Sequence, residues 1–582
     1  MALSEAGHRL AEAGLMPTSF GVLAFIGVLF ALYQRLLPHP LPGIPYNPKA
    51  ARNLLGDAPD MLREVGVTRE LNLWLVRQVN QLQAPLCQVF VQPFAKPWLL
   101  LADSVEAQDI LLRRREFDRS NFITDGLSPL DSFHARMKTG KTWRATRAWL
   151  QDLMSPSFLN NIVGPVMYES STHLVDFWET KSRLAGDRAF DVNEDLNHSA
   201  LDGMLSFVFD RHFEHTALGP QIEAASQLDP SSVEVGPNGE AKFPEGRLHE
   251  FIIALYKTVD AIDKVTKSMS PRLAMWWTRQ TPSYRKVAAV RRRVVREQVQ
   301  GARRRIEATG ETKTAIEHML TRETKVATKE NRPPDYENPI LMDEIAGQFI
   351  AGLHTTSTTL AWTFIYMTRI PEIQTKLRNA LHAAYADALE EGRPPTLAEL
   401  NKTRVPYLEA VLEEALRLHA TSVARQASRD TEVFGHRVPQ GTNVVLIANG
   451  PGFHAPSFNV DAGQRSPTAK KSNGWDETRD MRAFDPERWL VRKEGVSPDD
   501  VVDVEFDANA APQIAFGMGP RACWGRRLAT LELRMVTTLV VWNFDLMPVP
   551  PALADPKASY GIVHRADQCC LRLKSRREAT QG

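Results

Sequence analysis

The chain has 582 residues, and its 70 Lys and Arg nearly balance 69 Asp and Glu. This balance gives no support to a nucleic-acid-binding protein or to recruitment of an acidic partner through bulk charge. The length exceeds that of a usual single domain, and the 43% hydrophobic content is ordinary for a globular protein. The four cysteines, two of them adjacent, suggest no disulfide framework and favour a reducing compartment: Cys87, Cys523, Cys569 and Cys570.

The N-terminal region combines an apolar segment with a proline-rich one. Residues 1–37 contain a run at about 15–37 that approaches the roughly 20 residues needed to span a bilayer. No basic stretch and no small-residue cleavage site accompany it, so a single uncleaved membrane anchor is favoured over a signal peptide. Residues 38–48 predict a stiff proline hinge. Arg35, Lys49 and Arg52 follow the uncharged core of this run, residues 20–33, and favour a cytosolic position for the rest of the chain.

That orientation makes a prediction about glycosylation. Sequons begin at Asn197 and Asn401. We expect neither asparagine to carry a glycan, because a cytosolic domain does not meet the transferase.

The next elements predict a mixed, mainly helical chain. Residues 88–101 indicate a hairpin of two short strands, and 105–114 a helix. Residues 117–139 are polar and typical of a loop, although they hold four apolar side chains that either pack the loop or help to choose a substrate. The arginine-rich run 285–305 carries valines at helical intervals, so it predicts an amphipathic helix with a solvated face rather than a nucleic-acid site.

Trp143 and Arg147, in the sequence WRATR, are four residues apart and share one face of a predicted helix. An indole N–H and a guanidinium on one face can bind the same anionic group. Several basic residues nearby form either a patch for an acidic redox partner or ordinary solvated surface charge: Lys141, Arg144, Arg526 and Arg527.

Residues 342–367 predict a long buried helix with the sequence AGLHTT at its centre. The small residues Ala351 and Gly352 would let this helix pass close to a flat partner. Thr355 can donate a hydrogen bond and relay protons, beside Thr356. His354 could also pass protons, or it could be held in a structural hydrogen bond.

Residues 408–419 predict another helix, in which Glu414 and Arg417 share a face. By itself this pair predicts only a surface ion pair. Beyond it, a turn at 438–442 precedes a strand at 444–448. Residues 459–474 indicate a polar insertion without recognisable chemistry.

The decapeptide 516–525, FGMGPRACWG, is the most informative stretch of the chain. Cys523 precedes a predicted helix at 526–541, whose N-terminus should lower the thiol pKa and prepare a metal ligand. Gly519 and Gly525 leave room for a sharp turn beside a flat partner. Arg521 offers a forked donor to a carboxylate.

The spacing Phe-Gly-x-Gly-x-Arg-x-Cys-x-Gly resembles the haem-binding loop of the cytochrome P-450 superfamily at every defined position. The helix at 342–367 resembles the family's oxygen-activation helix, except that His354 stands where an acid is usual. The segment 484–489, FDPERW, resembles the one whose arginine completes a buried cluster. The proline usual after Arg417 is missing, which leaves Arg425 as the better carboxylate partner and Arg429 as the reserve.

This resemblance implies a mainly α fold with small β-sheets, the cytochrome P-450 fold, in a haem-thiolate catalytic domain at 49–582 that follows the membrane-anchor helix. The implied cofactor is haem b, with its iron bound by the thiolate of Cys523. The implied catalytic residues are Thr355, His354 and Thr356, and the implied structural cluster is Glu414, Arg417 and Arg488. The implied cofactor-binding residues are Trp143, Arg147, Ala351, Gly352, Arg425, Phe516, Gly517, Arg521, Cys523 and Gly525.

The implied function is a monooxygenase that inserts one oxygen atom of O₂ into a lipophilic small molecule, in a style resembling fungal enzymes of specialised metabolism. Electrons should come from NADPH through a separate NADPH-cytochrome reductase, with cytochrome b5 as a further donor, since no flavin or dinucleotide domain accompanies the haem region. The implied location is the endoplasmic reticulum membrane, crossed once. Two alternatives are a haem-thiolate isomerase or dehydratase, and a haem carrier or sensor. Thr355 argues against the first, and the joint presence of Thr355, the anchor and the basic residues argues against the second.

Overall fold

The structure is a computed structural model that describes residues 25–211, 213–469, 475–492 and 504–577. It is mainly helical, as predicted. Several helices begin with a proline in the first turn and a polar capping residue before it; the N–H of Ile340, for example, donates to Asn338 Oδ1 where α16 begins. The helices are α2 (Pro48–Ala51), α3 (Ala58–Thr68), α4 (Leu71–Leu82), α5 (Ser104–Leu112), α6 (Asn121–Gly126), α7 (Lys141–Trp149), α8 (Pro156–Phe158), α9 (Gly164–Ala185), α10 (Asn193–Val208), α11 (Gly219–Ser226), α12 (Glu250–Thr266), α13 (Pro271–Gln280), α14 (Pro282–Thr309), α15 (Ala315–Lys329), α16 (Pro339–Arg369), α17 (Pro371–Ala384), α18 (Ala386–Glu390), α19 (Leu397–Lys402), α20 (Pro406–Leu418), α21 (Arg526–Asn543) and α22 (Pro551–Ala554).

The strands form small sheets. The largest has five strands in the order β1-β2-β10-β7-β3, in which β2 pairs antiparallel with β1 and parallel with β10. This confirms the predicted hairpin and the predicted strand near 444–448. The strands are β1 (Leu86–Val89), β2 (Trp98–Leu101), β3 (Phe117–Arg119), β4 (Phe190–Asp191), β5 (Glu234–Val235), β6 (Ala241–Lys242), β7 (Val423–Ala427), β8 (Thr431–Val433), β9 (His436–Val438), β10 (Asn443–Leu446), β11 (Leu490–Arg492), β12 (Val504–Phe506), β13 (Phe544–Met547), β14 (Ala558–Tyr560), β15 (His564–Ala566) and β16 (Cys570–Ser575).

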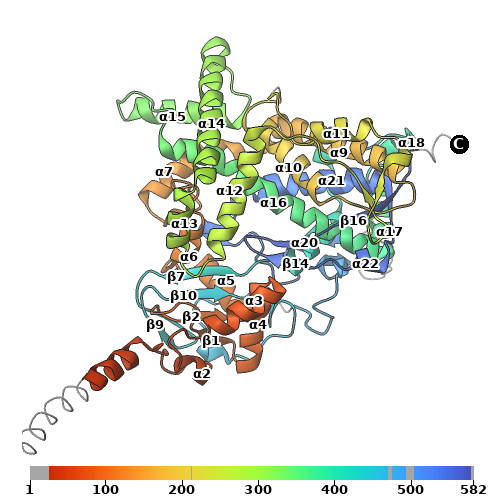
Figure 1. The fold of residues 1–582 in the computed structure, drawn as a ribbon. Coiled ribbons are helices and arrows are strands. Elements are labelled where there is room, and N and C mark those ends of the chain that lie inside the picture. Colours follow the sequence, from red (N-terminus) through yellow and green to blue (C-terminus); the bar gives the residue numbers. More distant parts are fainter. Residues whose placement is uncertain (1–24, 212, 470–474, 493–503, 578–582) are drawn as a thin grey trace, which may run out of the picture.

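The long helix α16 runs through the helical part of the molecule, as Figure 1 shows. It packs against α10, α20 and α21, and most of its apolar side chains lie in or against the largest apolar core. The predicted buried helix at 342–367 is therefore confirmed. The predicted helix at 408–419 corresponds to α20, and the arginine-rich run lies within α14, whose Val287, Val294 and Val295 are buried.

The segment 117–139 differs from the predicted loop. Its first residues form β3, and α6 follows after Ser120, whose Oγ accepts the N–H of Phe122. β3 adds to the edge of β7, with Arg119 opposite Arg425. Local polarity hid this strand, because its stability comes from a partner about 300 residues away in the chain.

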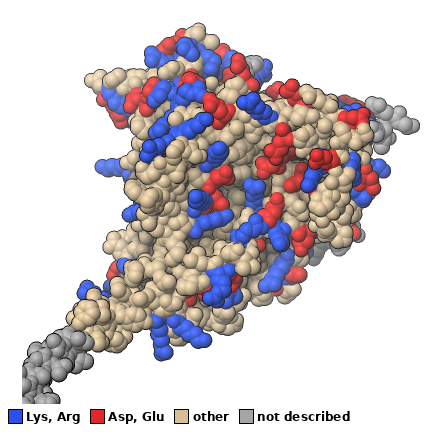
Figure 2. All heavy atoms as spheres, in the orientation of Figure 1, with Lys and Arg blue, Asp and Glu red and all other residues tan. Residues whose placement is uncertain are grey.

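The N-terminal helix at 25–36 extends away from the body of the molecule (Figure 1). Its side chains are exposed and mostly apolar, and this part of the surface is largely free of charge in Figure 2. Among the described residues, no helix has both the length and the apolar character needed to cross a membrane. The first part of the predicted anchor, 15–24, lies outside the described residues.

The proline-rich segment 38–48 is tied to the body of the molecule rather than free. The buried amide of Gln88 donates to Leu41 O and Ile44 O, at 2.9 and 2.8 Å, and accepts the N–H of Leu41. Ile44 is itself 2% exposed. A buried amide requires such partners, so this part of the predicted hinge belongs structurally to the sheet.

Candidate active site

The loop 516–525 is tightly closed. The N–H of Cys523 donates to Phe516 O at 2.7 Å, and the N–H of Gly517 donates to Ile514 O at 2.8 Å. Gly517 and Gly519 have φ of +61° and +67°, a conformation that suits glycine. A Cβ on Gly519 would also lie 2.3 Å from Leu111 O of α5. The loop is therefore fixed both by its own hydrogen bonds and by contact with α5.

The Cys523 side chain is accessible, yet protein surrounds it closely. Burial raises the pKa of the Cys523 thiol above its usual value. The Gly525 N–H and the charges of Arg119 and Arg147 lower it by less. The expected lowering by the helix N-terminus is thus wrong as a net effect in this structure, because desolvation of the thiolate is larger.

Four arginines converge beside this loop with few acidic partners. Arg425 is 4% exposed and Arg521 is 8% exposed. Burial and the charges of neighbouring arginines lower the pKa of Arg425 to about 9 and that of Arg521 to about 10. Burial also lowers the pKa of Arg119 and of Arg147. The cluster concentrates positive charge, which Asp118 offsets in part at Arg425 and Arg521 and Glu344 in part at Arg147. Asp118 also accepts hydrogen bonds from Thr139.

Within the described part of the chain, two polar atoms of the cluster are buried without a partner, namely Arg521 Nη1 and Arg119 Nε. Arg521 Nη2 donates to Met137 O. The indole ring of Trp143 lies against two of the guanidinium groups. Its centroid is 4.6 Å from Cζ of Arg521 and 5.5 Å from Cζ of Arg147. Arg429, the reserve residue, is exposed beyond the end of β7 and does not join the cluster.

Arg119 was not identified from the sequence. It lies opposite Arg425 across the β3–β7 pair, and the Cys523 thiolate is among the charges that act on its pKa. In the sequence, Arg119 stands out only because Asp118 precedes it in a short segment. That pair gives no indication of the strand with which the segment pairs.

The α16 helix presents an unusual face. Ala351 and Thr355 are exposed, one turn apart, in a helix whose other central residues are mostly buried. The Thr355 hydroxyl donates to Ala351 O at 2.8 Å. This face carries a small side chain and one hydroxyl, which leaves room for a flat molecule and supplies one hydrogen-bonding group.

Gly352 has a different neighbour from the one expected. A Cβ at this position would lie 2.6 Å from Met204 Cγ and 2.8 Å from Met204 Sδ of α10. The glycine therefore allows close packing of α16 on α10. A side chain at Gly352 would point toward α10. The structure therefore gives no support to the predicted approach of Gly352 to a macrocycle.

His354 also points toward α10. Its Nδ1 lies 3.0 Å from Asn197 Oδ1, which accepts a second hydrogen bond from Ser357 Oγ at 2.7 Å. Because the amide oxygen only accepts, Nδ1 is the donor. Burial lowers the pKa of His354 to about 3, so the imidazole is neutral. Of the two alternatives for His354, the structure shows the structural hydrogen bond. Asn197 is buried as well, which is a second reason to expect no glycan there.

A buried acid, Glu532 of α21, lies behind Thr356. Burial raises the pKa of Glu532 to about 8, and a hydrogen bond with the Thr356 side chain lowers it by less. Both side chains are almost fully buried. This carboxyl was not singled out from the sequence, since nothing local distinguishes it from other glutamates on an amphipathic helix.

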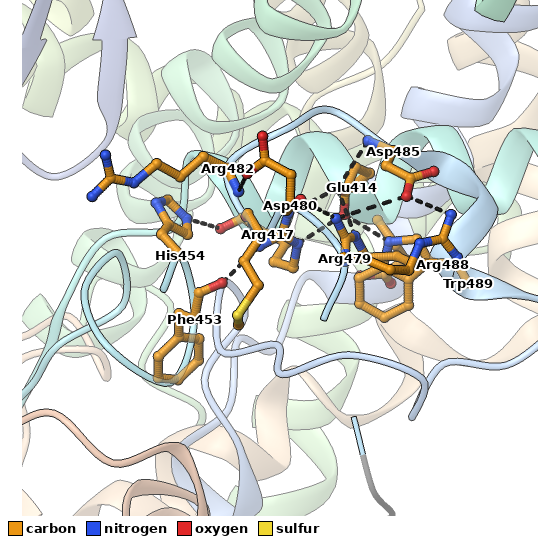
Figure 3. A network of polar contacts seen from close by, with 12 residues as sticks. Glu414, Arg417, Phe453, His454, Arg479, Asp480, Arg482, Asp485, Arg488 and Trp489 are labelled. Atoms are coloured by element: carbon orange, nitrogen blue, oxygen red, sulfur yellow. Dashed lines mark hydrogen bonds and ion pairs between the residues drawn. The ribbon is translucent and has the colours of Figure 1, made fainter. Parts of the chain in front are cut away.

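Glu414, Arg417 and Arg488 lie together in a buried network (Figure 3). Arg417 makes two bonds of 2.8 Å to the Glu414 carboxylate, and Arg488 Nε lies 2.9 Å from Glu414 Oε1. Trp489 Nε1 and the N–H of Asp485 also donate to this carboxylate. Burial raises the pKa of Glu414, but the two arginines lower it more.

The same network extends into the chain that precedes the cysteine loop. Arg417 Nη1 donates to Phe453 O and to Met481 O, at 2.7 and 2.9 Å. Arg488 Nη2 donates to Asp480 O. The cluster therefore ties α20 to two segments of irregular backbone, as Figure 3 shows.

These features fit haem b. The arginine cluster, with its unpartnered buried N–H groups, suits two carboxylates. Cys523 supplies a sulfur donor for iron, and the Ala351–Thr355 face suits a flat macrocycle. When bound, the haem would supply the oxygen chemistry, and these residues would hold and orient it.

Comparison with known proteins defines the class to which this chain belongs. The cytochrome P-450 family model matches residues 66–452 and 480–565, so the chain belongs to the cytochrome P-450 family. It is a haem-thiolate monooxygenase, an oxidoreductase.

Individual known proteins are similar to this chain over most of its length. The chain is 40% identical over 554 residues to the cytochrome P-450 monooxygenase xilC of Penicillium rubens, covering 94% of this chain and 95% of that one. It is 32% identical over 571 residues to the cytochrome P-450 monooxygenase TRI13 of Fusarium sporotrichioides, with 94% and 97% covered. The crystal structure of the cytochrome P450DA heme domain matches the fold with a TM-score of 0.63 at 19% identity, covering 93% of this chain and 98% of that one.

Proposed function

We propose that this enzyme inserts one oxygen atom of O₂ into a lipophilic small molecule in fungal specialised metabolism, with electrons from NADPH through a separate NADPH-cytochrome reductase. The observation that carries the proposal is the arginine cluster beside Cys523, because buried positive charge on both Arg425 and Arg521, which Asp118 offsets only in part, suits the haem carboxylates. The fungal relatives, each a monooxygenase by name, support the pathway class.

In this proposal, different residues of the chain bind the haem, transfer protons and support the site. Cys523 binds the iron, and Trp143, Arg147, Arg425 and Arg521 hold the carboxylates. The Thr355 hydroxyl moves a proton on the exposed face of α16, and His354 tunes that delivery from the opposite face through Asn197. Glu414, Arg417 and Arg488 hold the segments behind the haem.

We also propose that the chain is anchored once in the endoplasmic reticulum membrane, with the catalytic domain in the cytosol. The exposed apolar side chains of residues 25–36 support this, as do Leu273, Trp276 and Trp277, which are exposed on α13. Tryptophan is typical of membrane interfaces. Protease protection of tagged protein in microsomes tests the orientation; protection of a C-terminal tag would contradict it.

The function is tested with the full-length protein in microsomes containing reductase. We expect NADPH consumption with formation of a hydroxylated product from one member of a panel of terpenoid, polyketide and alkaloid intermediates. Cys523→Ser should lose the thiolate spectrum of the ferrous–CO complex, and Thr355→Val should divert electrons to hydrogen peroxide. Conversion of a substrate without NADPH or reductase would favour an isomerase or dehydratase.

A further inference from the structure

The segment 453–479 lies outside the match to the cytochrome P-450 family model, which covers residues on both sides of it. It contains the polar insertion predicted from the sequence. Its two arms are joined where Ser457 donates to the Glu477 carboxylate through N–H and Oγ, at 3.1 and 2.5 Å. Two hydrogen bonds therefore hold together the two described arms of this segment.

The insertion binds α5 through buried carboxylates. Arg465 makes a bidentate pair with Asp103, at 2.5 and 2.7 Å, and Asp103 is 2% exposed. In the part of the chain that the structure describes, this is the one ion pair of Asp103. Asp103 also caps α5 by accepting the N–H of Glu106 at 2.8 Å. A forked guanidinium on a buried carboxylate is the strongest form of such a pair.

Two further contacts extend along the same helix. The N–H of Ser466 donates to Glu106 Oε2 at 3.2 Å, and Thr468 Oγ1 donates to Asp109 Oδ2 at 2.8 Å. Both acids are fully buried. The insertion thus donates hydrogen bonds to one buried carboxylate in each turn of α5. Without the insertion, these carboxylates would be buried with fewer partners.

The opposite end of α5 contacts the cysteine loop. Leu111 O is the atom that a Cβ on Gly519 would meet at 2.3 Å. Ile110 and Leu111 share an apolar cluster with Ile514, which lies just before the loop. Met518 of the loop and Val460 of the insertion also pack against this cluster. Insertion, α5 and cysteine loop therefore form one continuous packed unit.

We propose that residues 453–469 form a brace that holds α5 against the cysteine loop, and that Arg465 is a positioning residue for the Cys523 thiolate. The brace acts at a distance from the iron, through the position of α5. This inference rests on the proposed assignment of Cys523 as the haem ligand.

The test uses the full-length holoenzyme and four variants. Arg465→Met removes the fork, and Arg465→Lys keeps one donor for Asp103. Asp103→Asn keeps the helix cap but removes the charge, and it serves if Arg465→Met does not fold. The matched control is Arg437→Met, which removes an arginine paired with Asp430 at 2.7 Å on the exposed β8–β9 hairpin.

Two readouts report on the loop itself. We expect Arg465→Met and Asp103→Asn to give a several-fold larger share of the thiol-ligated ferrous–CO form. We also expect faster hydrogen exchange in peptides covering 104–112 and 514–525. Arg465→Lys should recover most of the wild-type behaviour, and Arg437→Met should match the wild type in both readouts.

The outcomes separate this inference from the function on which it rests. If the wild-type protein gives no thiolate ferrous–CO form, the assignment of Cys523 is wrong. If the wild type gives it and folded Arg465→Met and Asp103→Asn proteins match the wild type in spectrum and exchange, the brace is wrong. A general loss of stability with unchanged spectrum and loop exchange would likewise overturn the positioning role.

Discussion

His354 is an unusual residue for which the sequence left two roles open, and the structure shows one of them, the structural hydrogen bond. It replaces the usual acid next to Thr355, but its imidazole donates to Asn197 on α10. With a pKa of about 3, it does not carry a proton as imidazolium near neutral pH. Any effect on proton delivery must come from holding α16 in place.

We predict that His354→Ala increases hydrogen peroxide leakage and lowers the unfolding free energy by about 1–3 kcal/mol, because it leaves a buried amide oxygen with one donor fewer. The pH profile of coupling between about pH 6 and 8 should stay unchanged, since the imidazole does not titrate there. Ser357→Ala is the comparison, because it removes the other donor to Asn197 Oδ1. Unchanged turnover and leakage in His354→Ala would contradict any tuning role.

Glu532 is a second residue whose environment determines its chemistry. Its pKa in the folded protein, about 8, lies above the unfolded value near 4.5. Stability from the bound proton is therefore complete below the unfolded pKa and is lost as pH rises through about 8. We predict that Glu532→Gln matches the wild type in thermal midpoint at pH 5 and exceeds it at pH 9, by the equivalent of a few kcal/mol. A constant difference between the two proteins across this range would show that Glu532 does not titrate in the fold.

At the scale of elements, the Glu414 network joins α20 to the irregular segments at 453 and 480–489. We predict that Glu414→Ala yields protein without haem, because two buried arginines lose their only shared carboxylate, at a cost of about 3–5 kcal/mol. Haem content and the ferrous–CO spectrum check this. The control is Glu297→Ala on α14, an exposed glutamate paired with Arg293, which should retain haem. A normal thiolate spectrum in Glu414→Ala would count against the structural role.

The contact of the cysteine loop with α5 makes a separate prediction. Gly519→Ala combines a positive φ with a Cβ placed 2.3 Å from Leu111 O. Gly310→Ala, at the end of α14, has a similar φ of +70° but open space around the Cβ, so it should cost only about 1–2 kcal/mol. We expect Gly519→Ala to lower the thermal midpoint more and to lose the thiolate spectrum. Equal effects of the two substitutions would mean that α5 does not constrain the loop.

For the whole molecule, the sequence predicts best what is local. The cysteine loop, α16 and the Glu414–Arg417 pair each lie within one short segment, so spacing could predict which side chains share a face. The burial of the Glu414–Arg417 pair followed only from the resemblance to the family. Arg119 could not be placed in the same way, because it reaches the arginine cluster only by pairing with a strand some 300 residues later. The neighbour of Gly352 likewise depends on how α10 packs.

The boundary between anchor and domain depends on such long-range contacts too, and it can be tested by a pair of deletions. The helix at 25–36 is exposed, with one described side-chain hydrogen bond to the body, from Tyr33 to Arg52 O. Removing residues 1–36 should therefore release the protein from membranes while leaving its thermal midpoint and ferrous–CO spectrum unchanged.

Removing residues 1–46 should behave differently, although it takes only ten more residues. It deletes Leu41 and Ile44, which together make three hydrogen bonds with the buried Gln88 side chain, and it uncovers the apolar surface beneath Ile44. Each unsatisfied group costs about 1–3 kcal/mol, so the thermal midpoint should fall by several degrees. Gln88→Leu in the protein that lacks residues 1–46 should restore part of the loss, because an apolar side chain there needs no partner. If both deletions have the same midpoint, the proline-rich segment is a free hinge after all, and the domain begins after residue 46.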